Sequence, residues 1–179
     1  MSLGLYLHIP YCFSKCRYCD FYSHPGERGV PEAYVDALLR ELSRFAPEAP
    51  LQPDTLYFGG GTPSLLRPEQ AKRLIDAARP MPGAEITLEA NPETVTEESL
   101  AGFREAGVNR ISFGVQSARD TQLRTLGRPH TAKQARAAFA AARRAGFANI
   151  SGDIMLALPH YTEAEFDETL ELIEDGGAT

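Results

Sequence analysis

The chain has 179 residues, of which 43% are hydrophobic, and this is enough for one globular domain with a buried core. Its formal net charge of −6 argues against nucleic acid or an anionic membrane as the main partner. No apolar run reaches the roughly 18–20 residues that span a bilayer, and the N-terminus lacks the basic start of a signal peptide. The sequence therefore predicts a cytoplasmic protein without an integral membrane segment.

Strand patterns and helix patterns alternate along the chain. Period-two alternation of apolar residues predicts strands at residues 3–9, 55–58, 85–90, 110–115 and 149–156. Apolar stripes, several with proline or threonine at the start and glycine at the end, predict helices at residues 31–45, 68–78, 96–106, 131–145 and 162–174. Such βα units form right-handed crossovers and a parallel sheet, so the predicted fold class is α/β.

One face of the predicted sheet is polar. Because side chains alternate along a strand, the apolar residues face the helices and leave polar or small residues opposite them: Tyr6, His8, Glu85, Thr87, Glu89, Ser112, Gly114, Gln116, Ser151, Asp153 and Met155. A flat sheet covered on both sides would need two apolar faces, so a barrel-like sheet with a polar interior fits better. Glu89, Gln116 and Asp153 lie in the later halves of their strands, where parallel sheets bind ligands. Ordinary structural hydrogen bonding is the alternative for each residue.

The three cysteines, Cys12, Cys16 and Cys19, follow the first predicted strand in the spacing Cys-x3-Cys-x2-Cys. An odd number of cysteines in a cytosolic setting favours a metal site over disulfides, and thiolates select zinc, copper(I) or iron–sulfur clusters. A structural zinc site would need a fourth ligand, for which His8 and His24 are the candidates. A [4Fe–4S] cluster explains the number better, because three cysteines leave one iron open for an exchangeable ligand.

The cysteine spacing in a loop after the first strand resembles the signature of the radical S-adenosylmethionine (SAM) superfamily. Five segments in order are similar to the oxygen-independent coproporphyrinogen III oxidase family: LYLHIPYC at 5–12, GGGTPS at 59–64, LEANPE at 88–93, SFGVQS at 112–117 and DIMLALP at 153–159. True oxidases of that family carry a further cysteine in the form Cys-x-Cys. Here Cys19 is followed by Asp20 and Phe21, which resembles the heme-chaperone branch.

This resemblance implies a partial (β/α) barrel of the radical SAM type, with about five βα units of an expected six. Residues 1–179 would then be an incomplete core domain, without the sixth βα unit and the C-terminal domain. The implied cofactors are a [4Fe–4S] cluster on Cys12, Cys16 and Cys19, SAM, and heme. The resemblance assigns SAM binding to Tyr6, Tyr18, Gly60, Gly61, Thr62, Glu89, Gln116, Arg128 and Asp153.

The implied function is to bind heme and transfer it to acceptor proteins, with an electron donor as a further partner. No residue is assigned as a general acid or base, because the reactive agent in this superfamily is a radical derived from SAM. Whether the protein is an enzyme stays open. The alternatives are radical decarboxylation of coproporphyrinogen III, another radical reaction such as methyl transfer, and a structural zinc-binding domain.

Overall fold

The computed structural model describes residues 3–45, 51–158 and 160–178. Its strands are β1 (Gly4–Ile9), β2 (Tyr11–Cys12), β3 (His24–Pro25), β4 (Thr55–Gly60), β5 (Glu85–Ala90), β6 (Arg110–Gln116) and β7 (Asn149–Ile154). Its α-helices are α1 (Glu32–Phe45), α2 (Pro68–Ala78), α3 (Glu97–Ala106), α4 (Asp120–Leu126), α5 (Ala132–Arg144) and α6 (Glu163–Gly176). Two 3₁₀ turns, η1 (Pro63–Leu65) and η2 (Pro92–Thr94), follow β4 and β5. No helix among these residues is both long and apolar enough to cross a membrane.

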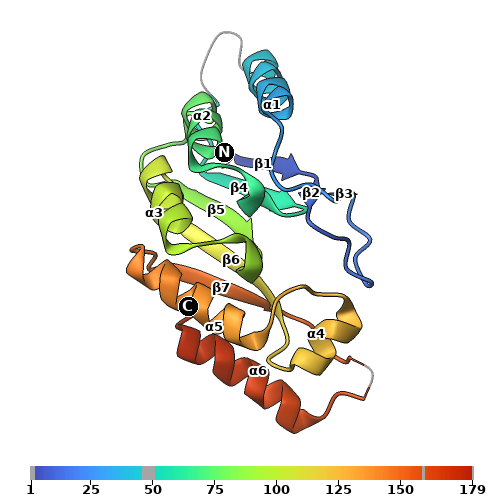
Figure 1. Cartoon of the computed structure of the whole chain (residues 1–179). Helices are drawn as coiled ribbons and strands as arrows, with labels where there is room; N and C mark the ends of the chain where they lie inside the picture. The colour runs from blue at the N-terminus through green and yellow to red at the C-terminus, as the bar shows by residue number, and fades with distance from the viewer. Residues whose placement is uncertain (1–2, 46–50, 159, 179) are drawn as a thin grey trace.

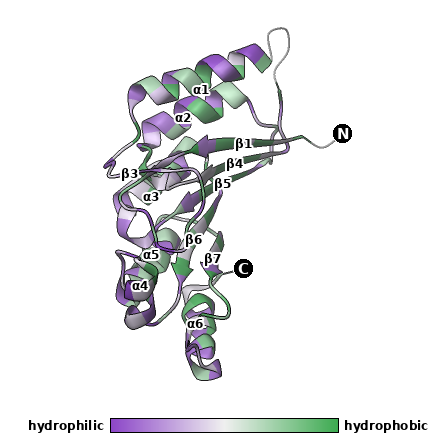
Figure 2. Ribbon diagram, turned by 90° about the vertical axis from the view of Figure 1, so that its right-hand side faces the viewer, coloured by the Kyte–Doolittle hydropathy of each residue, from purple (hydrophilic) through white to green (hydrophobic). Residues whose placement is uncertain are grey.

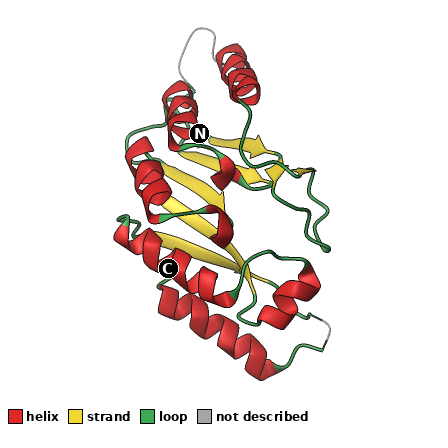
Figure 3. Ribbon diagram, in the orientation of Figure 1, coloured by secondary structure: helices red, strands yellow, loops and turns green. Residues whose placement is uncertain are grey.

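The main sheet has five strands in the order β1-β4-β5-β6-β7, and every neighbouring pair is parallel. Figures 1 and 3 show the five βα units in sequence along this sheet. The α/β class and the partial barrel are therefore confirmed. Within the described part of the chain, β1 and β7 are edge strands, so the sheet is open rather than closed. The cysteine loop between β2 and β3 and helix α4 both lie at the carboxyl ends of the strands (Figure 1).

The two faces of the sheet differ as the alternation predicted. Apolar side chains from all five strands are buried against the helices, and Phe113 of β6 packs on Phe139 of α5 at a ring distance of 5.2 Å. On the other face, Glu89 is in register with Ser112, and Ser112 is in register with Ser151. Figure 2 shows the hydropathy of these strands and the helices beside them. The sheet therefore has a polar face that ends at the carboxyl edge, with Thr87 and Ser112 buried in it.

Most predicted elements agree with the structure within a few residues, and the differences have local causes. Thr96 caps α3 as predicted, since its hydroxyl accepts a hydrogen bond from the Ser99 amide at 3.1 Å. The strand predicted at residues 149–156 ends at Ile154, and Leu156, an apolar residue of the predicted strand, is 65% exposed and does not face the helices as expected. Helix α4 and the β2–β3 pairing were not predicted, because seven and two residues are too short to show a periodic pattern.

Candidate functional site

A cavity of about 340 Å³ lies at the carboxyl ends of the strands, which is a size typical of small-molecule sites. It is lined by the cysteine loop, the turn after β4 and the last residues of β5, β6 and β7. The predicted site residues in its wall are Cys12, Cys16, Tyr18, Cys19, Gly60, Gly61, Thr62, Glu89, Gln116, Arg128 and Asp153. Residues that are more than 140 positions apart in the sequence thus share one cavity. Their assignment to SAM remains a prediction.

Tyr6 is the predicted site residue that the structure does not bring into this wall. Its side chain is 53% exposed, its hydroxyl lies 3.1 Å from His8 Nδ1, and its ring stacks on Tyr57 at 6.0 Å. Tyr57 in turn donates a hydrogen bond to Glu89, which lines the cavity. Tyr6 is therefore one residue removed from the cavity, and its predicted SAM contact is not visible in the arrangement.

Backbone hydrogen bonds fix the cysteine loop at both ends and to a distant helix. The Glu27 amide donates to the Cys12 carbonyl at 3.1 Å, and the Arg17 amide donates to the carbonyl of Leu126, the last residue of α4, at 2.9 Å. All three cysteines are free thiols; Cys12 is buried, and Cys16 and Cys19 are half-buried. The loop therefore presents three thiols into one cavity.

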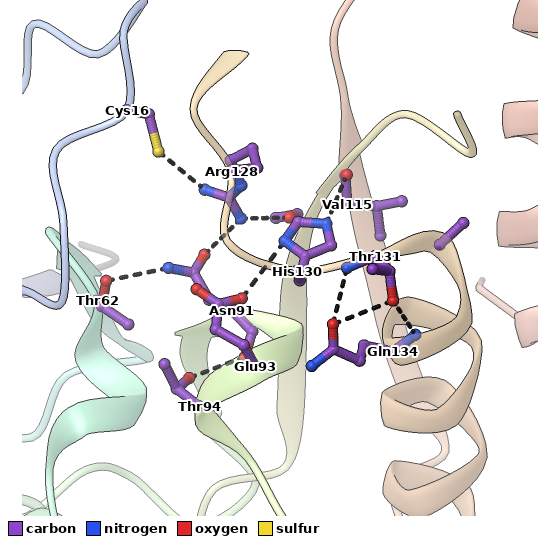
Figure 4. A network of polar contacts seen from close by, with 12 residues as sticks. Cys16, Thr62, Asn91, Glu93, Thr94, Val115, Arg128, His130, Thr131 and Gln134 are labelled. Atoms are coloured by element: carbon purple, nitrogen blue, oxygen red, sulfur yellow. Dashed lines mark hydrogen bonds and ion pairs between the residues drawn. The ribbon is translucent and has the colours of Figure 1, made fainter. Parts of the chain in front are cut away.

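Side-chain donors also reach two of these sulfurs. The Thr62 hydroxyl donates to Cys12 Sγ at 3.4 Å, and Arg128 Nη1 donates to Cys16 Sγ at 3.6 Å (Figure 4). Hydrogen bonds of this kind raise the reduction potential of a cluster bound to the sulfur. The chemistry of the wall is thus suited to thiolate ligands.

The arrangement fits an iron–sulfur cluster better than a single zinc ion. Among the described residues, no three histidine, cysteine, aspartate or glutamate side chains are placed so that they could hold one ion. A [4Fe–4S] cluster does not need such convergence, because each cysteine binds a different iron. His8 is hydrogen-bonded to the Tyr22 carbonyl at 3.0 Å and His24 to the Tyr22 hydroxyl at 3.2 Å, and neither lines the cavity. Neither histidine is therefore in place as a fourth zinc ligand.

The glycine run after β4 allows the backbone to approach the cysteine loop. A Cβ atom at Gly61 would lie 2.8 Å from the Tyr11 carbonyl oxygen and 2.9 Å from Cys12 Sγ, closer than real side chains come. Gly60 has a φ of +121°, which only glycine adopts without strain, and its amide donates to Glu89 Oε2 at 3.1 Å. The run is therefore required by the local geometry and not only by a turn.

Glu89 lies at the centre of the polar face. Tyr57 Oη donates to its Oε1 at 2.8 Å, and the Gly60 amide donates to the other oxygen. Burial raises the pKa of Glu89 above its usual range, while these two hydrogen bonds oppose the shift. Burial also raises the pKa of Tyr57, and the carboxylate of Glu89 raises it further, so Tyr57 remains a donor. Sequence reasoning missed Tyr57, although the alternation in β4 places it on the polar face.

Arg128 joins the ends of two strands. Its Nη2 donates to the Asn91 side-chain oxygen at 2.7 Å and to the Gly114 carbonyl at 2.5 Å (Figure 4). Among the described residues its buried Nε has no hydrogen-bond partner, and the side chain brings a positive charge to the cavity wall. Asn91 also donates to the Thr62 hydroxyl at 3.1 Å. Asn91 was not predicted as a site residue, although it directly follows β5 within one of the quoted motifs.

Gln116 and Asp153 close the far side of the cavity. The register between β6 and β7 shifts between Gly114 and Gln116, and Gln116 has a φ of +66°. Asp153 lines the cavity and accepts a hydrogen bond from the Ser112 hydroxyl at 3.2 Å. Loss of water contacts within the cavity raises its pKa, and the Ser112 hydroxyl opposes that shift. Acidic and basic groups therefore face each other across the cavity, which suits a zwitterionic ligand.

Comparisons with known proteins identify the family of this chain. The model of the radical SAM superfamily matches residues 6–173. The heme chaperone HemW of Escherichia coli is 43% identical over 163 residues, which cover 88% of this chain and 43% of the relative. HemW of Haemophilus influenzae is 39% identical, with 96% of this chain and 48% of the relative covered. The structure of the coproporphyrinogen III oxidase HemN from Escherichia coli matches with a TM-score of 0.87 and 30% identity, over 99% of this chain and 42% of that one. The chain thus spans less than half the length of these relatives.

Proposed function

Because this chain belongs to the radical SAM superfamily, we propose that it binds a [4Fe–4S] cluster and SAM and forms part of a heme chaperone. The observation that carries the proposal is the single cavity lined by three free thiols, the glycine run and residues of opposite charge. We include heme and heme-acceptor proteins in this proposal because the relatives named above are heme chaperones. An electron donor is a further proposed partner.

In this proposal Cys12, Cys16 and Cys19 hold the cluster, and the cluster when bound supplies one-electron reduction of the SAM sulfonium. Arg128 brings a guanidinium charge to the cavity wall for the methionine carboxylate, while Glu89 offers an anionic acceptor for the amino group. Gln116 and Asp153 offer an amide and a carboxylate to the ribose hydroxyls. Thr62 and the glycine run hold the backbone close to the cysteine loop. None of these residues is proposed as a general acid or base.

The chaperone branch is favoured over the oxidase by the residues after the last cysteine. Asp20 and Phe21 follow Cys19, so the Cys-x-Cys arrangement expected of the oxidase is not present in the chain. Identity to the heme chaperones is 39–43%, against 30% to the oxidase structure. Three free thiols agree with a reducing compartment, and we propose a cytoplasmic location.

Radical decarboxylation of coproporphyrinogen III is the second candidate, and the high structural similarity to the oxidase favours it. The two functions differ in what is consumed. An oxidase consumes SAM and porphyrinogen together under anaerobic, reducing conditions. A chaperone binds heme and releases it to an acceptor, and it consumes neither SAM nor porphyrinogen.

Anaerobic reconstitution with iron and sulfide, followed by electron paramagnetic resonance with and without SAM, tests the shared part of the proposal. We expect about four irons and four sulfides per chain and a change in the signal of the reduced cluster when SAM is added. Heme titration and transfer to an apo-hemoprotein then test the chaperone. A protein that binds stoichiometric zinc and no iron would refute the proposal, and decarboxylation without heme transfer would favour the oxidase.

A further inference from the structure

His130 is a buried histidine to which the proposed function gives no role. It is 2% exposed and lies between Arg128 and Thr131, the residue that caps α5. Its Nε2 lies 3.1 Å from the Val115 carbonyl oxygen in β6 (Figure 4). Because a carbonyl can only accept a hydrogen bond, Nε2 carries the hydrogen and donates it. The ring is therefore held to the backbone near the carboxyl end of β6.

The Val115 carbonyl belongs to an irregular part of that strand. Gly114 and Gln116 have partners in β7, but the register shifts between them and leaves Val115 out of the ladder. Gln116 then adopts a φ of +66°, which non-glycine residues rarely occupy, and its side chain lines the cavity. Bulges of this kind re-aim side chains next to functional sites. The Val115 carbonyl also accepts a hydrogen bond from the Ser117 amide at 2.9 Å, so the hydrogen bond from His130 adds to that contact in stabilising the backbone geometry that directs Gln116 into the cavity.

Glu93 of η2 faces the other nitrogen of the ring. Its Oε2 lies 3.4 Å from His130 Nδ1, within ion-pair distance, and neither atom has a hydrogen-bond partner among the described residues. The Glu93 side chain is 10% exposed and that of His130 is 0% exposed. Buried polar atoms without hydrogen-bond partners are costly. Because the Nε2 hydrogen goes to the Val115 carbonyl, the contact between Nδ1 and Oε2 is attractive when a second proton lies between them, on either group. Glu93 therefore sets the orientation of the imidazole, as carboxylates do for functional histidines.

Arg128 and His130, which lie in the same turn, each connect β6 to the segment that follows β5. Arg128 bonds to the Gly114 carbonyl and to Asn91, while His130 bonds to the next carbonyl of β6 and faces Glu93, two residues beyond Asn91. We propose that His130, oriented by Glu93, is a positioning residue that holds the β6 bulge so that Gln116 contacts SAM. This inference takes the identity of the ligand, SAM, from the proposed function. The role of His130 in holding the bulge does not depend on that function.

The test compares two substitutions of His130 with a control elsewhere between the same strands. In His130→Gln the amide nitrogen reaches about as far as Nε2 and can still donate to Val115, whereas in His130→Asn it is too short. Asn109 joins the amino ends of β5 and β6 by bonding to the Ile86 amide and the Ala84 carbonyl, both at 2.8 Å. Asn109→Ala therefore removes a comparable connection far from the cavity.

Calorimetric SAM titration of the reconstituted full chain is the first measurement. We expect His130→Asn to weaken SAM binding about tenfold, and His130→Gln and Asn109→Ala to stay within about threefold of wild type. Iron and sulfide content should be equal in all four proteins. Wild-type affinity in His130→Asn would overturn the inference, and so would equal losses in both His130 variants, since that pattern indicates a general packing defect.

Hydrogen exchange of the protein before reconstitution is the second measurement, and it does not depend on SAM. The Met155 amide donates to the Gln116 carbonyl at 3.1 Å and reports on the bulge. We expect faster exchange of this amide in His130→Asn than in Asn109→Ala, with protection restored in His130→Gln. If the wild type assembles no cluster and binds no SAM, the proposed function fails, and this measurement decides the positioning role by itself. Unchanged exchange in His130→Asn would overturn it.

Discussion

Replacing Gly61 with alanine tests the claim that the glycine run sets the position of the cysteine loop. The new Cβ would lie 2.8 Å from the Tyr11 carbonyl oxygen, 3.0 Å from the Tyr11 amide nitrogen and 2.9 Å from Cys12 Sγ. Two of these three atoms are backbone, and Gly61 is itself held by the hydrogen bond from its amide to the Ile9 carbonyl at 2.9 Å. The strain can be relieved only if the loop moves by roughly half an ångström, as in other overpacked sites.

Overpacking of this kind costs about 1–3 kcal/mol. For a domain of this size, a loss of about 2 kcal/mol lowers Tm by roughly 4–8 °C. Since Cys12 moves away with the loop, we also expect less iron and sulfide per chain after reconstitution. Thermal unfolding before reconstitution and iron analysis after it measure the two effects separately.

Gly29→Ala is the matched control, because its added Cβ would have only the Leu65 carbonyl oxygen within 4 Å, at 3.9 Å. It should leave both Tm and iron content close to the wild-type values. If Gly61→Ala behaves like Gly29→Ala in both assays, the close approach does not constrain the loop and the reasoning is wrong.

Three other substitutions test the remaining parts of the site. Thr62→Val removes the donor to Cys12 Sγ, so the cluster should assemble but show a more negative reduction potential in a redox titration; an unchanged potential would contradict the contact. Cys19→Ser should weaken cluster assembly about tenfold or more and abolish the SAM-dependent change in the resonance signal, whereas full iron content would exclude Cys19 as a ligand. Asp153→Asn keeps the acceptor for Ser112 but removes a carboxylate whose pKa is raised in the folded protein. The wild type therefore loses stability as the pH rises from about 4 through that raised pKa. In urea unfolding, the free energy of unfolding of the variant should increase relative to that of the wild type between about pH 4 and pH 7. A difference between the two proteins that does not change with pH would argue against the raised pKa.

Local patterns were sufficient to predict the elements and the faces of the sheet. In β5 and β6 the side chains alternate, and this alternation correctly placed Glu89 and Ser112 on the polar face and Phe113 in the core. The cap at Thr96 was likewise visible in its immediate neighbours. These features depend on residues only a few positions apart, so the sequence is sufficient to predict them.

Contacts between distant segments could not be predicted in this way. Tyr57 reaches Glu89 because β4 and β5 are neighbours in a particular register, and Asn91 links Thr62 to Arg128 across three turns. Nothing near Tyr6 in the sequence indicates that its ring turns toward Tyr57 and stays outside the cavity wall. Such contacts depend on strand order, register and turn conformation together.

By itself, the sequence determined the α/β class, the polar carboxyl edge and the thiolate chemistry of the cysteine loop, because each depends on residue type and short spacing. The tertiary structure alone decided which residues meet in the cavity. It also decided that a shift in the β6–β7 register turns Gln116 inward and that His130 and Glu93 face each other behind it. The bulge and the buried pair depend on how β6, β7, η2 and the turn that carries His130 pack together. No pattern of nearby residues encodes that packing.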